Sequence, residues 1–366
     1  MNKKPSQKDT KKIELSKKLA SLFSKKAWKE TRELWIGAGV LVAVAALAGW
    51  VFFSSLPTTD VEQNPGEEIA ALDRHPLTGE VIAEPYTVLP QVFGVMIENA
   101  ADAWPLSGID KAFLVIEAPV EAGIPRFIAF FSEEDSVEKI GPVRSARPYY
   151  VDWADGLQAI YAHVGGSPAA LEQIAQGNTL DVNQFWFGEY FWRENGTRYA
   201  PHNVYTNTEL LVEVIEEAFS LEEPSYDLWS FASIEPIANP IEDITIDFAD
   251  GTLYDPVWTY SVGRNAYLRD QSGYTWLEGG AETWADNVIV IAMDIRTIDN
   301  VGRKSIESVG TGNALLFNGG DVALVTWRKD AQDDRLVFEK NGEEVTFAPG
   351  VTWIEVVSDL DQVEYE

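Results

Sequence analysis

The pattern of apolar and polar residues sets an uncharged segment near the start of the chain apart from the remaining residues. Ile36 to Leu56 contains 21 residues without a charge, which as a helix is long enough to cross the ~30 Å hydrocarbon layer of a membrane. A lysine-rich stretch precedes it, and a stretch rich in Pro, Gly and acidic residues comes after it. Because positively charged segments stay in the cytoplasm, the pattern predicts a basic cytoplasmic tail (1–33), a single-pass transmembrane helix (34–56), a linker (57–85) and an extracytoplasmic location for residues 57–366.

Two alternatives for this segment stay open. A cleaved signal peptide would also explain the small residues at positions 45–48, although the leader and the apolar run are both long for that class of signal. The tail from Lys11 to Arg32 has apolar residues at nearly helical spacing. That spacing fits an amphipathic helix lying on anionic lipid, and a flexible topogenic tail explains it equally well.

Residues 86–222 alternate between strand-like and helical patterns. Apolar strand-like runs occupy 92–97, 112–116, 126–131 and 157–164. Residues 207–220 carry an apolar stripe at helical spacing, and Ser167 followed by Pro168 is typical of a helix N-cap and first turn. Nearly continuous apolar strands with covering helices predict a mixed α/β domain over 86–222.

Residues 240–360 have a different texture, with short strands and no helical stripe longer than two turns. The strand-like runs are 244–248, 257–262, 266–269, 288–293, 314–317, 322–327, 335–338 and 351–357. Asn341 and Gly342 between two such runs indicate a two-residue hairpin. This part is predicted to be a mostly antiparallel β domain. The expected fold is therefore an N-terminal transmembrane helix, a mixed α/β domain and a β-rich domain.

Composition excludes several classes of site and partner. The 366 residues carry a formal net charge of −30 and no cysteine, which rules out disulfides, thiolate zinc sites, cysteine nucleophiles and a lipid-bearing N-terminal Cys. An acidic body of this size repels phosphate backbones, so no nucleic acid is expected as a partner. The chain has three histidines and no metal-ligand spacing, so we expect neither a metal nor a cofactor.

Arginines are concentrated in one short segment, Gly-Pro-Val-Arg-Ser-Ala-Arg, which contains Arg144 and Arg147. Arg126 on the preceding predicted strand is placed to approach them. A guanidinium group is a planar fork that binds carboxylate or phosphate through two parallel hydrogen bonds. In so acidic a chain, these arginines either bind an anionic ligand or neutralise internal carboxylates such as Glu117 and Glu121, and both interpretations stay open.

Gly165, Gly166 and Ser167 stand between a predicted strand and a predicted helix. Free backbone N–H groups and the helix dipole at such a junction favour anions. The spacing matches neither a phosphate loop nor a dinucleotide fingerprint, and Ser167 lacks the flanking glycines of a nucleophile elbow. The alternative is that Ser167 only caps the helix.

His163 and His202 each lie beside a turn in the same predicted domain. Either histidine could carry a proton, with Glu117 or Glu121 as the orienting partner, and both could equally be ordinary hydrogen-bonding residues. The aromatic run at 185–192 fits a platform for a sugar ring or a flat partner, or simply core packing.

These segments together resemble the YerB-like family of bacterial extracytoplasmic proteins, whose two domains have no known function. The resemblance covers about residues 75–358 and rests on His75-Pro76-Leu77-Thr78-Gly79, Val95-Met96-Ile97-Glu98-Asn99, Glu117-Ala118-Pro119-Val120-Glu121, Arg126-Phe127, Gly141-Pro142-Val143-Arg144-Ser145-Ala146-Arg147-Pro148, His163-Val164-Gly165-Gly166-Ser167, Ala200-Pro201-His202-Asn203, Asn287-Val288-Ile289-Val290, Asn341-Gly342 and Pro349-Gly350-Val351-Thr352-Trp353-Ile354. It implies an envelope location and two domains. Family members typically carry a lipid-bearing Cys that this chain lacks, and Pro125 stands where the family commonly has Thr.

The favoured hypothesis is a membrane-anchored envelope protein that binds an anionic or glycan ligand. Arg126, Arg144 and Arg147 would hold the charge, assisted by the backbone of residues 165–167. One alternative is a transferase or hydrolase acting on envelope glycopolymers, since the layout is broadly similar to that of LytR-CpsA-Psr phosphotransferases. The other is a scaffold for protein partners whose identity the sequence does not indicate.

Overall fold

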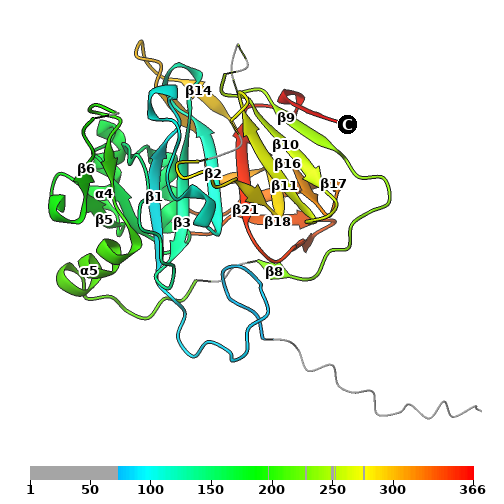
Figure 1. Cartoon of the computed structure of the whole chain (residues 1–366), viewed down its shortest axis with the longest axis horizontal. Helices are drawn as coiled ribbons and strands as arrows, with labels where there is room; N and C mark the ends of the chain where they lie inside the picture. The colour runs from blue at the N-terminus through cyan, green and yellow to red at the C-terminus, as the bar shows by residue number, and fades with distance from the viewer. Residues whose placement is uncertain (1–72, 197, 227–228, 249–250, 252, 275–276) are drawn as a thin grey trace, which may run out of the picture. The chain divides into compact units, whose positions relative to one another are not determined.

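The structure, a computed structural model, describes residues 73–366 apart from 197, 227–228, 249–250, 252 and 275–276. The expected cytoplasmic tail and transmembrane segment, with most of the expected linker, lie outside the described residues. Within the linker, an ordered turn begins at His75, where the Gly79 amide donates to the His75 carbonyl at 2.9 Å. The chain from Ala71 to Glu366 forms one structural unit in which strands predominate (Figure 1).

The centre of this unit is a sheet of eleven strands to which both halves of the chain contribute. In order across the sheet, these are β19 (Glu343–Glu344), β18 (Val337–Lys340), β17 (Asp321–Lys329), β16 (Gly310–Asn318), β13 (Asn287–Ala292), β21 (Thr352–Val357), β2 (Leu114–Pro119), β3 (Pro125–Ser132), β1 (Val92–Glu98), β4 (Ile160–His163) and β5 (Leu180–Asn183). The C-terminal β21 pairs in parallel with β2, which joins the two halves.

Smaller elements surround this sheet. A second sheet has the order β12 (Trp284–Ala285), β11 (Ala266–Gln271), β10 (Pro256–Ser261), β9 (Asp243–Ile246) and β22 (Val363–Tyr365). Three two-stranded pairs are β14 (Ile295–Thr297) with β15 (Lys304–Ile306), β20 (Thr346–Phe347) with β8 (Ser230–Phe231), and β6 (Trp192–Arg193) with β7 (Val204–Tyr205). The α-helices of the described residues are α3 (Pro148–Asp155), α4 (Pro168–Gln176) and α5 (Thr208–Ala218).

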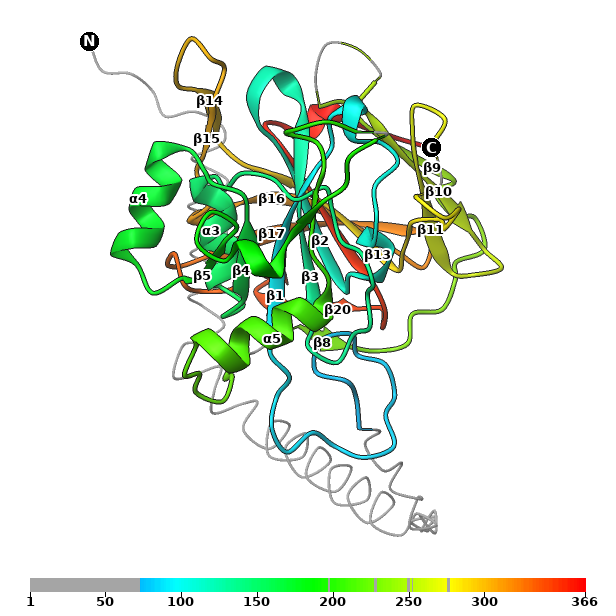
Figure 2. The ribbon, with the colours of Figure 1, turned by 60° about the vertical axis from the view of Figure 1, so that its left-hand side comes forward.

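Alternate side chains of the central strands face two different cores. Ile116 of β2 belongs to the core that contains Tyr149 and Trp153 of α3. Its neighbour Val115 belongs to the other core, together with Trp258 of β10. Figure 2 shows α3 and α4 on one side of the sheet and β9 to β11 on the other. Because both faces are covered, the central strands are mostly apolar rather than alternating, with Glu117 of β2 and Glu355 of β21 among the exceptions.

Local sequence explains where the helices begin. The Ser167 side chain accepts a hydrogen bond from the Ala170 amide ahead of α4, and Asn207 does the same for the Leu210 amide ahead of α5. The strand runs and both helices expected from the sequence are present in the described residues, and β18 and β19 form the expected hairpin. Helix α3 was not expected, because almost every residue in it is buried and leaves no polar stripe.

The fold class expected from the sequence is wrong. None of the helices in the described residues is long and apolar enough to cross a membrane, and residues 36–56 lie outside those residues. Strands from 86–222 and from 240–360 share the eleven-stranded sheet. A strand run gives no information on its distant partner, so this shared sheet could not be inferred from local pattern.

The strand directions bring several loops to one edge of the sheet. Strands β2, β1, β4 and β5 run parallel to one another, and β3 runs antiparallel between β2 and β1. The carboxyl ends of the parallel strands therefore lie along the same edge as the start of β3. In open α/β sheets this is the edge at which ligands are bound.

Candidate anion-binding site

The arginine-bearing segment after residue 140 lies across the carboxyl ends of β1 and β4. The Arg144 amide donates to the Met96 carbonyl at 2.9 Å, and the Arg144 carbonyl accepts from the Val164 amide at 3.0 Å. The Ala146 amide donates to the Gly165 carbonyl at 2.9 Å. These bonds fix the backbone that carries Arg144 between the two strand ends.

Arg144 and His202 share one buried carboxylate, Glu98, at the end of β1. The Glu98 side chain is 4% exposed; its Oε1 lies 3.0 Å from Arg144 Nε, and its Oε2 lies 2.8 Å from His202 Nδ1. The terminal nitrogens Nη1 and Nη2 of Arg144, and Nε2 of His202, have no partner among the described residues. Glu98 therefore orients a guanidinium and an imidazole whose other nitrogens are available.

Arg126 and Arg147 are held inside the protein instead. Arg126 Nη1 donates to the Ser145 carbonyl at 2.8 Å, and Arg147 Nη1 donates to the Ala146 carbonyl at 2.7 Å. Glu121 accepts from Arg147 Nε at 3.0 Å and lies 3.9 Å from Arg126 Nη2. Two of the three expected ligand-binding arginines thus position the loop that carries the third.

The three guanidinium groups nevertheless lie close enough to repel one another. Burial, and then the charges of Arg147 and Arg144, lower the pKa of Arg126. Partial burial opposes the ionisation of Glu121, but the charge and hydrogen bonds of Arg147 outweigh it and lower the pKa of that carboxyl. Three carboxylates lie among these arginines: Glu98 and Glu121 pair with them, and Asp181 lies on His163 at the same edge.

His163 lies at the same edge but is sealed. Its side chain is fully buried and stacks on Tyr161; Nδ1 lies 2.7 Å from the Gly165 carbonyl and Nε2 lies 2.7 Å from Asp181 Oδ1. Both ring nitrogens are occupied and neither reaches solvent. His163 is therefore not placed to exchange a proton with a ligand.

The glycine pair and Ser167 are also engaged with the protein. The Gly165 amide donates to Asn183 Oδ1 at 3.1 Å, and the Ser167 amide donates to the Ala146 carbonyl at 3.2 Å. The Ser167 hydroxyl caps α4 by accepting from the Ala170 amide at 3.3 Å. These bonds leave the Gly165 and Ser167 amides of the expected anion cradle turned toward the protein rather than toward a ligand.

Gly165 also has a conformational role at this edge. Its φ is +59°, and a Cβ at this position would lie 2.7 Å from the Phe185 ring. We expect Gly165→Ala to lower the free energy of unfolding by about 1–2 kcal/mol, measured by urea denaturation, because a left-handed non-glycine residue and the displaced ring both cost energy.

The matched control for Gly165→Ala is Gly342→Ala, which has a φ of +83° and no heavy atom within 4 Å of the added Cβ. It carries the backbone cost without the ring contact. A Gly165→Ala variant no less stable than Gly342→Ala would show that the Phe185 contact contributes nothing.

A second group of ionisable residues is buried between the two sheets. Glu117 on β2 and Glu355 on β21 are register neighbours, and both are fully buried. Arg269 Nη2 donates to Glu117 Oε2 at 2.7 Å, and Asn99 Nδ2 donates to Glu117 Oε1 at 3.0 Å. Glu355 Oε1 accepts from the Trp258 indole at 3.0 Å, while its Oε2 makes no hydrogen bond.

One of these two buried carboxyls, Glu117 or Glu355, carries a proton. Burial, and then the charge of Glu117, raise the pKa of Glu355 well above its usual range. Burial also raises the pKa of Glu117, but the charge of Arg269 and the hydrogen bonds that Glu117 accepts from Arg269 and Asn99 oppose this rise, so Glu355 is the residue that stays neutral. Glu117 is thus a structural residue joined to Arg269, not a free catalytic base. The sequence analysis did not identify Glu98, Arg269 or Glu355. The two glutamates could have been found, because each is a charged residue in an apolar strand run.

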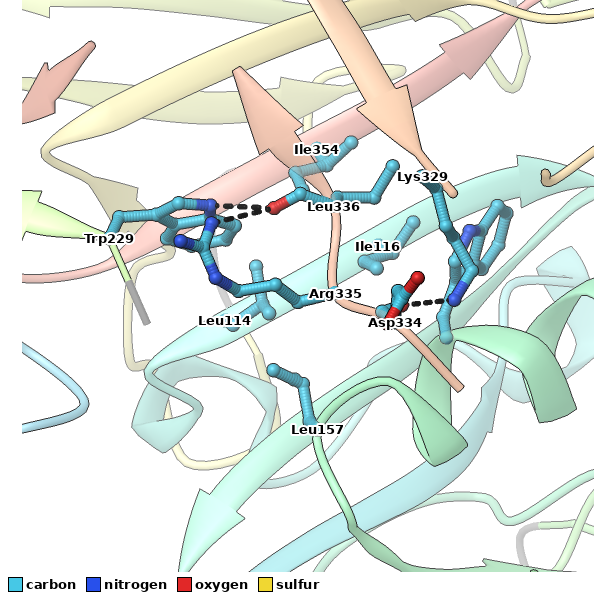
Figure 3. Close-up of a pocket in the computed structure, with 10 residues that line it drawn as sticks. Leu114, Ile116, Leu157, Trp229, Lys329, Asp334, Arg335, Leu336 and Ile354 are labelled. Carbon is cyan, nitrogen blue, oxygen red and sulfur yellow. Dashed lines mark hydrogen bonds between the residues drawn. The ribbon is translucent and has the colours of Figure 1, made fainter. Parts of the chain in front are cut away.

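An apolar pocket lies elsewhere, where Trp153, Leu157 and Trp229 meet the Lys329 side chain (Figure 3). Its volume of about 20 Å³ holds one water rather than a ligand. Lys329 Nζ donates to the carbonyls of Gln332, at 2.7 Å, and Asp334, and burial lowers its pKa to about 8. None of the three arginines of the carboxyl edge lines this pocket.

Comparison with known proteins identifies the family. Two family models, described as the N-terminal and C-terminal domains of a protein of unknown function (DUF3048), match residues 77–221 and 244–354. The chain belongs to the DUF3048 family. The Arg144 site lies within the N-terminal DUF3048 region, whereas Arg269 comes from the C-terminal one. The buried Glu117–Arg269 pair therefore joins the two DUF3048 regions.

Known relatives confirm the YerB-like resemblance. A protein of Bacillus subtilis (strain 168) named "Putative lipoprotein YerB" is 33% identical over 291 residues, which cover 78% of this chain and 86% of that protein. The crystal structure of the YerB protein from Bacillus subtilis matches with a TM-score of 0.72 and 31% identity, over 80% of this chain and 99% of that chain. This DUF3048 protein thus shares both sequence and fold with YerB.

Proposed function

We propose that this chain is a membrane-associated protein of the cell envelope that binds an anionic ligand at the carboxyl edge of β1 and β4. The name of its relative YerB, which refers to a lipoprotein, supports the envelope location. The binding proposal rests on the position of Arg144. Its Nε lies 3.0 Å from the buried Glu98, and its side chain is 20% exposed. Its Nη1 and Nη2 make no hydrogen bond with the described residues.

The surroundings of Arg144 favour an anion in two ways. The gathering of three arginines at one edge is unusual in so acidic a chain. His202 Nδ1 donates to the same Glu98, and its Nε2, which donates when the imidazole is protonated, lies on the other side of that ring. A guanidinium that is fixed before binding loses little side-chain entropy when it takes a carboxylate or phosphate.

Titration with inorganic phosphate, followed by NMR shifts of the arginine side chains, tests this proposal. We expect Arg144→Gln to weaken phosphate binding at least about tenfold, since hydrogen bonds to charged groups contribute about 1.5–3 kcal/mol. His202→Gln should weaken it less, because Nε2 of the imidazole donates only when the ring is protonated, whereas the guanidinium always offers donors from both Nη1 and Nη2.

The control is Arg328→Gln on β17, where the arginine is paired with Asp330 and Glu339. This variant should bind phosphate like the wild type. Phosphate binding that is absent from the wild type, or equally strong in Arg144→Gln, would refute an anion site at Arg144.

A further inference from the structure

Two large aromatic side chains stand exposed at the same edge of the sheet. Phe185 is 66% exposed and Trp186 is 77% exposed, immediately after β5. The rest of the aromatic run turns inward, with Tyr190 and Phe191 buried. Exposed apolar side chains of this size, side by side in the chain, are typical of ligand-binding surfaces.

The backbone of this aromatic pair is tied to the neighbouring loop. Asn183 Oδ1 accepts from the Phe185 amide at 3.2 Å and from the Gly165 amide at 3.1 Å, so one side chain joins the two loops. The Trp186 amide donates to the Asn183 carbonyl at 2.8 Å. The Phe185 ring also covers Gly165 closely enough to exclude a Cβ.

The aromatic pair lies beside the segment that carries Arg144. Val164, whose amide bonds the Arg144 carbonyl, is next to Gly165, which the Phe185 ring covers. Strands β1, β4 and β5 are consecutive neighbours, so the strand that ends at Glu98 and the strand that leads to Phe185 are roughly 10 Å apart. A small free anion at Arg144 would not reach the rings, whereas a longer ligand would touch both.

A third exposed aromatic lies close to His202 in the chain. Tyr199 is 76% exposed, and its carbonyl accepts from the His202 amide at 2.9 Å.

We propose that Phe185 and Trp186 form a stacking subsite and that the ligand is an anionic glycan, which rests on the anion-binding function proposed above. A sugar ring has an apolar C–H face that packs on an aromatic ring, while its hydroxyl edges stay solvated. A carboxylate or phosphate carried by the same glycan reaches Arg144.

Binding of three probes to the chain tests this assignment: inorganic phosphate, a hyaluronan tetrasaccharide with its carboxylates, and the uncharged chitotetraose. We expect the double variant Phe185→Ala, Trp186→Ala to weaken tetrasaccharide binding at least about tenfold by calorimetry while phosphate binding changes less than about twofold. Arg144→Gln should weaken both anionic probes. The tetrasaccharide should also bind more tightly than chitotetraose.

The control is Leu324→Ala, which removes another exposed apolar side chain, 62% exposed on β17. It should leave all three probes unchanged. Two results would overturn the glycan subsite while leaving the anion site in place. In both, phosphate binds through Arg144; the tetrasaccharide either does not bind, or binds the double variant as tightly as the wild type. If every variant, including Arg144→Gln, binds phosphate as the wild type does, the anion site itself is refuted. Binding to phosphatidylglycerol vesicles that depends on Trp186, without tetrasaccharide binding, would overturn the glycan in favour of lipid.

Discussion

We expect Glu355→Gln to raise the free energy of unfolding by about 2–3 kcal/mol at pH 7. The ordinary pKa of this carboxyl is 4.5, so above that pH the unfolded chain releases the Glu355 proton while the folded chain keeps it. The unfolded state then binds fewer protons, so wild-type stability falls as pH rises, by about 1.4 kcal/mol for each pH unit. Glutamine copies the neutral acid without this cost, and its oxygen still accepts from Trp258.

Urea unfolding between pH 4 and pH 8 measures this effect. The stability difference between Glu355→Gln and wild type should shrink toward pH 4, where Glu355 is protonated in both states. Glu343→Gln, which alters an exposed glutamate on β19, should follow the wild-type pH dependence. A Glu355→Gln variant that is less stable than wild type at pH 7 would show that Glu355 is folded as a carboxylate.

The second large effect is expected at Arg269. Arg269→Met should lower the free energy of unfolding by about 3–5 kcal/mol at pH 7, because it leaves Glu117 buried without its cation. Arg269 also lies over the rings of Trp353, at 5.3 Å, and Phe127, at 5.5 Å, so packing is lost as well. The loss should be smaller near pH 4, where both buried carboxyls are neutral.

Two further variants separate the charge effect from a general failure to fold. Adding Glu117→Gln to Arg269→Met should recover part of the stability at pH 7, since no ion is then left buried. Arg296→Met removes an exposed arginine paired with Asp294 and should not change the unfolding midpoint. If Arg269→Met costs less than about 1 kcal/mol, or the double variant is the least stable of all, the buried pair does not hold the two DUF3048 regions together.

The sequence drew attention to Glu117 but did not show what this residue does. A glutamate within an apolar strand run is noticeable in the sequence, and a catalytic role at a ligand site was one expectation. The sequence could not show that Arg269, 152 residues away, would pair with it. Glu121, four residues later, pairs with Arg147 as the internal alternative anticipated. Carboxylates in one short segment thus serve two different clusters.

The sequence by itself determined the longer apolar strands, helices α4 and α5, the hairpin between β18 and β19, and the family resemblance, but not short strands such as β5, β14 and β22. These features depend on side-chain periodicity, caps and turn residues within a few positions of one another. It also singled out the arginine segment, because cations are scarce in this chain.

Only the tertiary structure decided that the two halves share one sheet, that Arg144 stays partly exposed while Arg126 and Arg147 are buried, and that Phe185 and Trp186 face outward. Each of these depends on pairing between residues far apart in the chain. The same arginine or tryptophan is buried or available according to which distant backbone or carboxylate packs against it, and local pattern carries no record of that partner.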